Sequence, residues 1–251
     1  MIHQTRFELP EMNINFEGDL LVFDKPYQCT SFDLVEKVKK YIYRAESIVG
    51  ATLTVAPQKK MSKKKIKVGH AGTLDPLATG VMIICIGSFT KKIEQYQKQE
   101  KEYTGTFTLG ATTPSFDLEK PVDETYPIEH ITEKQIYSVA QSFVGEQDQI
   151  PPHFSAVKID GKRAYLLARQ GKELEIKSKK ITISEFEITR ISFPEVDFRI
   201  VCSKGTYIRS IARDFGQRLE TGAHLTTLRR TRIGEFKVED TIKVEVKDND
   251  K

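Results

Sequence analysis

The stretch GHAGTLDPLATGVMIICIG, residues 69–87, joins a glycine-rich segment directly to the most apolar run of the chain. Three glycines and one proline among residues 69–80 favour a loop. Residues 81–87 are uniformly apolar and rich in β-branched side chains, which predicts a strand buried on both faces. The pattern therefore places Asp75 on a loop at the mouth of a buried strand.

Predicted strands and helices alternate irregularly on either side of this stretch. Residues 31–44 predict a helix with Ser31 as its N-cap, a T-x-x-Q capping box predicts a helix over 132–145, and an apolar stripe predicts an amphipathic helix over 206–220. The remaining predictions are strands over 19–26, 103–110, 181–191, 196–203 and 232–238, a short helix ending at Gly171, and irregular segments over 1–18 and 45–67. The sequence predicts one mixed α/β (α+β) domain over residues 1–240 and a short charged tail over 241–251.

Composition excludes several classes of protein. The chain has 251 residues, 39% hydrophobic and 29% charged, which is typical of globular proteins. Its three cysteines lie far apart, so the sequence shows neither a disulfide framework nor a zinc motif and indicates a reducing compartment. There is no signal-peptide pattern and no run of about 20 apolar residues. We expect a cytoplasmic protein.

Charge is unevenly distributed although the net charge is only +4. Residues 58–67 carry six lysines and no acid, further basic residues cluster near Arg230, and acids gather in 117–124 and 239–250. Such segregation is typical of proteins that bind a polyanion, whereas ordinary solvated surface is the alternative. We hypothesise that the lysines of 58–67 attract the phosphates of such a polyanion.

Asp75 is the strongest candidate for chemistry. Pro76 disfavours the helical conformation at Asp75 and holds it extended. A carboxylate on such a loop suits a nucleophile or general base, and the alternative is a turn in which it bonds nearby backbone amides. His70 has no further ligand type at metal spacing, and the glycines match no nucleotide-binding motif, so we expect neither a metal site nor a phosphate-binding loop in this stretch.

Arg209 lies in the first turn of a predicted helix, where the helix dipole slightly disfavours a cation. It pairs with a carboxylate or phosphate, or else extends over apolar surface. Tyr103, Tyr207 and Phe154 are candidates for stacking on a base, although such side chains equally form cores.

Six segments in order resemble the TruB-type tRNA pseudouridine-55 synthases. They are GDLLVFDKP (18–26), GHAGTLDPLATGVMIICIG (69–87), KEYTGTFTLGATTPSFD (101–117), IPPHFSAVKIDGKRAYLLARQG (150–171), CSKGTYIRSIARDFG (202–216) and GAHLTTLRRTRIGEF (222–236). The resemblance implies a mostly antiparallel mixed sheet flanked by helices, with a central RNA-binding cleft. It also implies a cofactor-free isomerase that turns a flipped-out uracil and rejoins it to its ribose through C5, in the T-loop of tRNA.

The resemblance also implies residue roles. Asp75 matches the catalytic carboxylate, which attacks C1′ or acts through a glycal intermediate, and Arg209 matches its partner. Tyr103 matches the tyrosine that stacks on the target base. The remaining matches are contacts to the RNA or the wall of the site: His70, Tyr207, Leu228, Lys25 and Pro26. Residues 145–175 match an insertion that closes on the stem-loop of the T-arm.

Two departures from the family pattern stand out. Little chain follows Val238, so we expect no C-terminal PUA domain. Residues 45–67 are longer and richer in lysine than the pattern. We expect a monomer that binds tRNA. Two alternatives remain at this point, a tRNA-folding chaperone and a synthase for another RNA.

Overall fold

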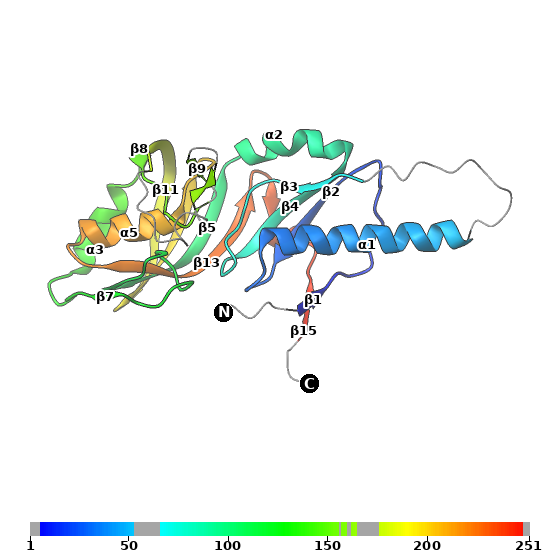
Figure 1. Cartoon of the computed structure of the whole chain (residues 1–251). Coiled ribbons are helices and arrows are strands. Elements are labelled where there is room, and N and C mark those ends of the chain that lie inside the picture. Colours follow the sequence, from blue (N-terminus) through cyan, green and yellow to red (C-terminus); the bar gives the residue numbers. More distant parts are fainter. Residues whose placement is uncertain (1–5, 53–65, 156, 160–161, 165–175, 248–251) are drawn as a thin grey trace. The chain divides into compact units, whose positions relative to one another are not determined.

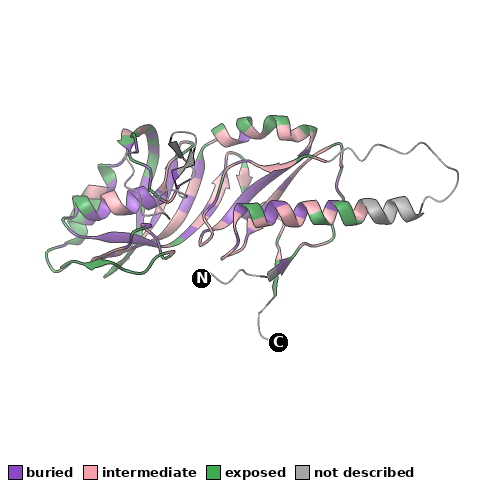
Figure 2. Ribbon diagram, in the orientation of Figure 1, coloured by how far each residue is buried: buried purple, intermediate pink, exposed green. Residues whose placement is uncertain are grey.

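The computed structural model describes residues 6–52, 66–155, 157–159, 162–164 and 176–247 (Figure 1). Most of the lysine-rich stretch and the short helix expected before Gly171 lie outside these residues. Buried residues lie mainly on the strands (Figure 2). No helix in the described part is long and apolar enough to cross a membrane.

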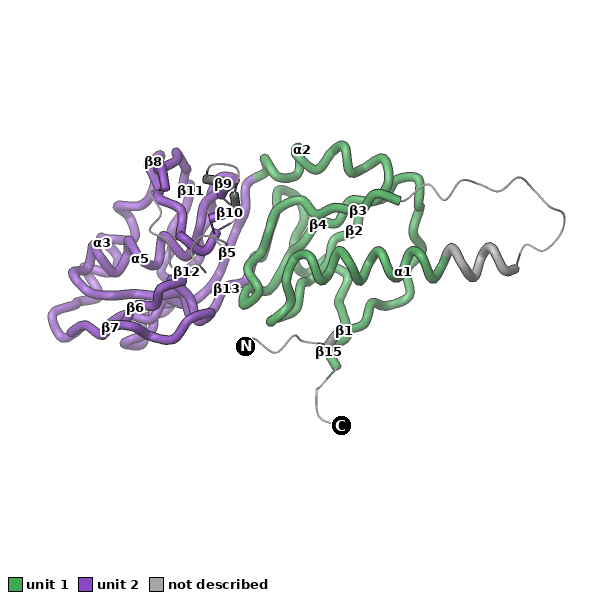
Figure 3. Tube along the Cα trace, in the orientation of Figure 1, with its two compact units in different colours: residues 1–99, 230–251 green, residues 100–229 purple. Residues whose placement is uncertain are grey.

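The chain divides into two compact units (Figure 3). Unit 1 contains residues 1–99 and 230–251, and unit 2 contains residues 100–229. The chain passes from unit 2 back to unit 1 between residues 229 and 230, inside strand β13 (Ala223–Ile233), so this strand contributes residues to both units.

Unit 1 is a small sheet with a helix on each face. Strand order is β2-β4-β13, with β3 beside β4 and β14 beside β13. Strands β2 and β3 both run antiparallel to β4. Its elements are β1 (Arg6–Glu8), β2 (Gly18–Lys25), α1 (Ser31–Thr52), β3 (Val68–His70), β4 (Thr79–Gly87), η1 (Ser88–Lys92), α2 (Ile93–Lys98), β14 (Phe236–Lys237), η2 (Val238–Asp240) and β15 (Glu245–Lys247).

Strand β4 is buried on both faces, as the sequence predicts. Met82 and Ile84 pack with Phe23 and the apolar face of α1. Their neighbours along the strand, such as Ile83, point to the other side and pack with Tyr96 of α2. Both faces are covered because alternate side chains of a strand point in opposite directions.

Unit 2 is an antiparallel sheet with an aromatic core. Strand order is β13-β5-β12-β11-β8. Rings from three strands, one helix and the turn after α3 fill the core with centroids 4.2–6.3 Å apart, and they belong to Phe107, Phe186, Phe198, Phe215 and Phe143. The elements are β5 (Lys101–Leu109), β6 (Ala111–Thr112), β7 (Glu124–Thr125), α3 (Glu133–Gln141), β8 (Gly145–Gln149), β9 (Lys158–Ile159), β10 (Lys162–Arg163), β11 (Lys179–Ser192), β12 (Glu195–Cys202) and α5 (Ile208–Arg218).

The expected α+β class with mostly antiparallel pairing is confirmed in both units, but several boundaries were wrong. Helix α1 continues through Gly50 to Thr52, so residues 45–52 are helical rather than irregular, and an isolated glycine near the end of a helix is tolerated. Helix α3 ends at Gln141, short of the predicted glycine, and β13 begins well before Arg232. The segments expected to be irregular at the two ends pair with each other as β1 and β15.

The predicted loop over 69–80 is shorter than expected, because β3 and β4 take its ends. Gly80 belongs to β4 with φ +109°, and a Cβ there would lie 2.2 Å from the carbonyl oxygen of Arg230. This glycine serves a close approach of two backbones, which composition alone cannot distinguish from a flexible turn.

Candidate active site

The Asp75 loop, defined as residues 71–78, connects β3 to β4. Asp75 is half-buried, and its flanking residues Leu74 and Ala78 are buried. The amide of Ala78 donates to the carbonyl of Asp75 at 3.1 Å and closes a tight turn around Pro76. The loop therefore presents one carboxylate between two anchored residues.

Ser31 holds the residue before Asp75. Its hydroxyl accepts a hydrogen bond from the Leu74 amide and donates one to the Leu74 carbonyl, both at 2.9 Å. The expected N-cap role of Ser31 was wrong by one residue, because Thr30 caps α1: its hydroxyl accepts from the Asp33 amide at 3.0 Å, and the Asp33 carboxylate accepts from the Thr30 amide. The buried Ser31 hydroxyl is thus available to the loop.

Lys25, at the end of β2, holds the residue after Asp75. Its fully buried ammonium donates to the carbonyls of Pro26 at 2.9 Å, Cys29 at 2.5 Å and Pro76 at 3.4 Å. Burial lowers the Lys25 pKa to about 8, against the opposing effects of Cys29 and Asp75. Lys25 thus contacts the loop directly, and the carbonyl of Pro26 accepts from the same ammonium.

Arg230 is a loop contact that sequence reasoning missed. It is only 1% exposed, and its guanidinium donates to the carbonyls of Val81 at 2.8 Å, Thr73 at 3.3 Å and Gly72 at 3.3 Å. The basic cluster near residue 230 suggested a surface for RNA, but this member points inward. The useful signal was its position in β13, where Leu228, Arg230 and the apolar Ile233 are buried.

His70 ends β3 and leads into the loop. Its Nδ1 has no hydrogen-bond partner in the described part of the chain. Burial lowers its pKa, partly opposed by the backbone of Gly72, so the imidazole is neutral at neutral pH. Among the described residues, no group of three or more His, Cys, Asp or Glu side chains could hold a metal ion.

Arg209 is the second residue of α5 and is buried, so the alternative of an exposed, extended side chain was wrong. It donates to the carbonyls of Ser115 at 3.3 Å and Phe154 at 3.1 Å. Its Nε lies 3.6 Å from a carboxylate oxygen of Asp117, which is also buried. Sequence reasoning missed Asp117 because it begins an acidic run that resembled ordinary surface.

Tyr207 precedes α5 and is held by two side chains from neighbouring strands. The Gln149 side chain accepts from the Tyr207 amide at 2.8 Å and donates to the Tyr207 carbonyl at 3.1 Å. The Lys179 ammonium lies 4.2 Å from the centroid of the tyrosine ring. Gln149 and Lys179 are cross-strand partners on β8 and β11. One position in the register of these strands therefore supports both the backbone and the ring of Tyr207.

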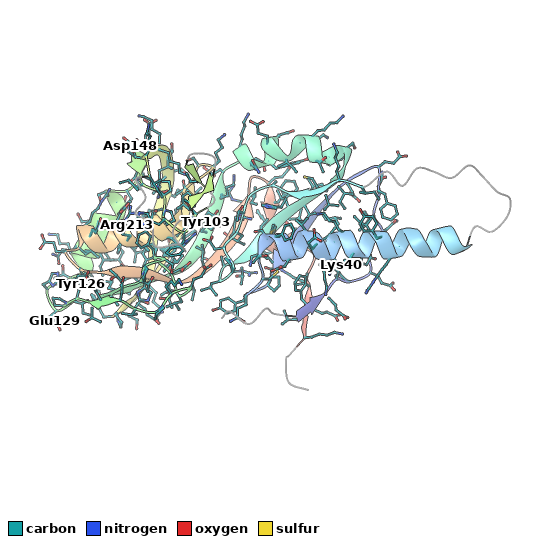
Figure 4. All side chains as sticks on the ribbon, viewed as in Figure 1. Lys40, Tyr103, Tyr126, Glu129, Asp148 and Arg213 are labelled. Atoms are coloured by element: carbon teal, nitrogen blue, oxygen red, sulfur yellow. The ribbon has the colours of Figure 1, made fainter. Side chains whose placement is uncertain are left out.

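Tyr103 lies on β5 opposite Ile200 of β12 and is largely buried (Figure 4). Leu228 is equally buried on β13. Phe154 is half-buried, with the Lys120 ammonium 5.8 Å from its ring centroid. In unit 1, Lys25 bonds the loop that carries Asp75, and His70 leads into it. The candidates in unit 2 are Tyr103, Phe154, Tyr207, Arg209 and Leu228.

Comparisons with known proteins show which family the chain is similar to. A family model described as TruB family pseudouridylate synthase (N terminal domain) matches residues 59–208, and one described as tRNA pseudouridylate synthase B C-terminal domain matches residues 209–248. The tRNA pseudouridine synthase B of Phocaeicola vulgatus is 54% identical over 92% of this chain and 93% of its own length. That of Flavobacterium johnsoniae is 55% identical over 91% of this chain and 93% of its own length.

A solved Cbf5–Nop10–Gar1 complex contains a chain with the same fold, at a TM-score of 0.64 and 28% identity. The match covers 91% of this chain and 52% of the chain in that complex, about half its length. The two family models lie end to end along most of this sequence, and relatives more than half identical match over nine-tenths of it. The chain therefore belongs to the TruB family of pseudouridylate synthases.

Proposed function

We propose that the protein converts uridine to pseudouridine in tRNA, at position 55 of the T-loop, with Asp75 as the catalytic carboxylate. Family membership and the printed names of the relatives support the reaction class. The observation that carries the assignment of Asp75 is its loop, in which buried side chains bond the backbone of Leu74 before it and Pro76 after it. Chemistry at a sugar carbon requires a carboxylate held in this way.

The reaction is an isomerisation and needs no external oxidant or reductant. The bond between N1 of uracil and C1′ of ribose breaks, the base turns, and C5 bonds to C1′; the hydrogen on C5 leaves as a proton and N1 takes up a proton, so the composition is unchanged. Asp75 either attacks C1′ directly or removes the proton on C2′ so that a glycal intermediate forms, and both routes use its ionised carboxylate. The uridine leaves the base stack first, since a stacked nucleotide does not expose C1′ to a side chain.

The remaining candidates take roles around the flipped base. By the family pattern, Arg209 pairs with Asp75. A guanidinium has several N–H donors and can therefore serve more than one acceptor. Tyr103 stacks on the base, Leu228 packs against it, and Tyr207 and His70 contact the RNA. A neutral His70 suits a contact that needs a hydrogen-bond acceptor or donor rather than a charge.

The partner is the T-arm stem-loop, recognised by its shape and by the flipped base rather than by a groove sequence, because A-form RNA hides its major groove. We place the closing of the protein on this stem-loop in residues 145–175. The two units act together as one catalytic domain, and the active form is a cytoplasmic monomer without metal or cofactor.

Tritium release tests the proposal. A tRNA transcript with 5-tritiated uridine loses tritium to water only if the C5 hydrogen is expelled. Wild type should release tritium, Asp75→Asn should release none, and Asp240→Asn, an exposed carboxylate on η2, should match wild type. Mapping the product then identifies the position.

The same variants separate the alternatives. A chaperone would bind and refold tRNA with Asp75→Asn as well as with wild type and would release no tritium. A synthase for another RNA would release tritium from that RNA and leave the T-loop uridine unmodified. Either result would overturn the proposal.

A further inference from the structure

We infer that Arg230 and Ser31 are positioning residues that hold the Asp75 loop in the geometry the reaction needs. The inference rests on the proposed function, but it concerns residues to which the family resemblance assigns no role. Neither side chain is placed against the substrate. Both act through the backbone on which Asp75 is carried.

The hydrogen bonds cover the loop almost continuously. Arg230 bonds the carbonyls of Gly72 and Thr73, and Ser31 bonds both backbone polar groups of Leu74. Three successive residues immediately before Asp75 are thus tied to side chains from outside the loop. Arg230 also bonds the carbonyl of Val81, so the same guanidinium spans the loop from its beginning to the strand that follows.

The charge of Arg230 supports a role in shaping the loop. In the described part of the chain its hydrogen bonds all go to backbone carbonyls, and a buried cation without a carboxylate partner is costly. Lys25 lies close enough for Arg230 to lower its pKa, and Lys25 likewise bonds only carbonyls. Two buried cations thus donate hydrogen bonds to backbone carbonyls of one loop. Filling this space would not by itself require charged side chains.

The fork of the guanidinium explains why an arginine is present. Its Nε and two terminal nitrogens each bond a different carbonyl, whereas a lysine offers one compact ammonium. Displacing a catalytic group by about 1 Å can slow a reaction about 100-fold. Arg230→Lys, which keeps the charge and loses the fork, should therefore slow the chemical step.

The test compares Arg230→Lys with Arg190→Lys, whose side chain forms an exposed ion pair with Glu195 and Asp197 in unit 2. Three quantities are measured for each protein: the single-turnover rate of tritium release at saturating tRNA, the Kd for tRNA, and hydrogen–deuterium exchange of peptides spanning residues 71–80. Arg230→Lys should lower the rate at least about 10-fold, leave the Kd within twofold, and speed exchange in the loop. Arg190→Lys should change none of them.

Ser31→Ala keeps the inference testable if Arg230→Lys does not fold. It removes only the Leu74 contact and should produce the same pattern, a slower rate with faster loop exchange and unchanged tRNA affinity. Folded variants that react at the wild-type rate would overturn the inference, as would a slower rate with unchanged loop exchange. If wild type itself releases no tritium, the proposed function fails, while the exchange data still show whether these side chains hold the loop.

Discussion

The Asp75 loop in unit 1 and the start of α5 in unit 2 present their functional side chains by the same device. In each, one small polar side chain bonds both the amide and the carbonyl of a single residue: Ser31 with Leu74, and Gln149 with Tyr207. The bonded residue lies one position before Asp75 or two before Arg209. In both regions, side chains from outside the segment therefore anchor the backbone close to a functional residue.

The two regions differ in how their buried cations are balanced. Arg209 lies beside a buried carboxylate, Asp117, and also bonds two carbonyls. Among the residues that the structure describes, Lys25 and Arg230 donate their hydrogen bonds to backbone carbonyls. The start of α5 is thus stabilised by an ion pair, whereas the Asp75 loop is stabilised by cations that donate hydrogen bonds to backbone carbonyls. Variants that remove one kind of partner should separate these two designs.

Asp117→Asn should have the largest effect on stability. It leaves Arg209 buried beside a neutral amide, and breaking a buried ion pair costs about 3 kcal/mol. Urea titration of wild type and variant measures the loss. The exposed pair of Arg190 and Asp197 offers the control, since Asp197→Asn should leave the unfolding midpoint nearly unchanged. Equal losses in the two variants would contradict a special role for the buried pair.

Lys25 should make stability depend on pH. Its pKa is about 8 in the folded protein against an ordinary value of 10.5, so the unfolded chain binds more protons between these values. Stability from this group is therefore lost as pH falls towards 8 and gained as pH rises, by up to about 3 kcal/mol over the whole window. The free energy of unfolding, compared between wild type and Lys25→Met from pH 7.5 to 9, measures this slope.

That narrow range matters because Cys29 and Cys85 act in the opposite direction. Burial raises the pKa of each thiol to about 11 from 9, so their contribution falls as pH rises above 9. The predicted signature is a stability difference between wild type and Lys25→Met that grows in favour of wild type with rising pH. A difference that stays constant would show that the ammonium is not desolvated.

Gln149→Ala should destabilise the helix start by about 1–3 kcal/mol, because the Tyr207 amide and carbonyl lose their partner. Ser31→Ala should cost a similar amount at the loop. The two variants should differ in exchange: Gln149→Ala should speed deuterium uptake around 203–209 only, and Ser31→Ala around 71–80 only. Uptake that rises throughout the chain in both would show that neither contact acts locally.

Local patterns predicted much of the fold, and the misses have a common cause. The apolar run of β4 and the T-x-x-Q box of α3 depend on neighbouring residues and were recognised. The pairing of β1 with β15, and the close approach of Gly80 to Arg230, depend on residues more than 100 positions apart. Such contacts leave little trace in any short window of sequence.

The candidate site divides in the same way. Asp75 and Arg209 were identifiable from their loop and helix contexts, and the resemblance supplied their roles. Asp117 and Arg230 were missed because charged residues in acidic or basic runs are usually solvated, and only the structure shows that these two are buried. A charged residue at an inward position of a strand, as Arg230 is on β13, was the available clue.

The most direct test of the central claim uses a T-arm stem-loop with a single 5-tritiated uridine at the target position. Wild type should release the tritium and leave pseudouridine at that position. Asp75→Asn should bind the stem-loop with similar affinity and release none. Release by Asp75→Asn at the wild-type rate would show that this carboxylate does not carry the reaction and would contradict the account.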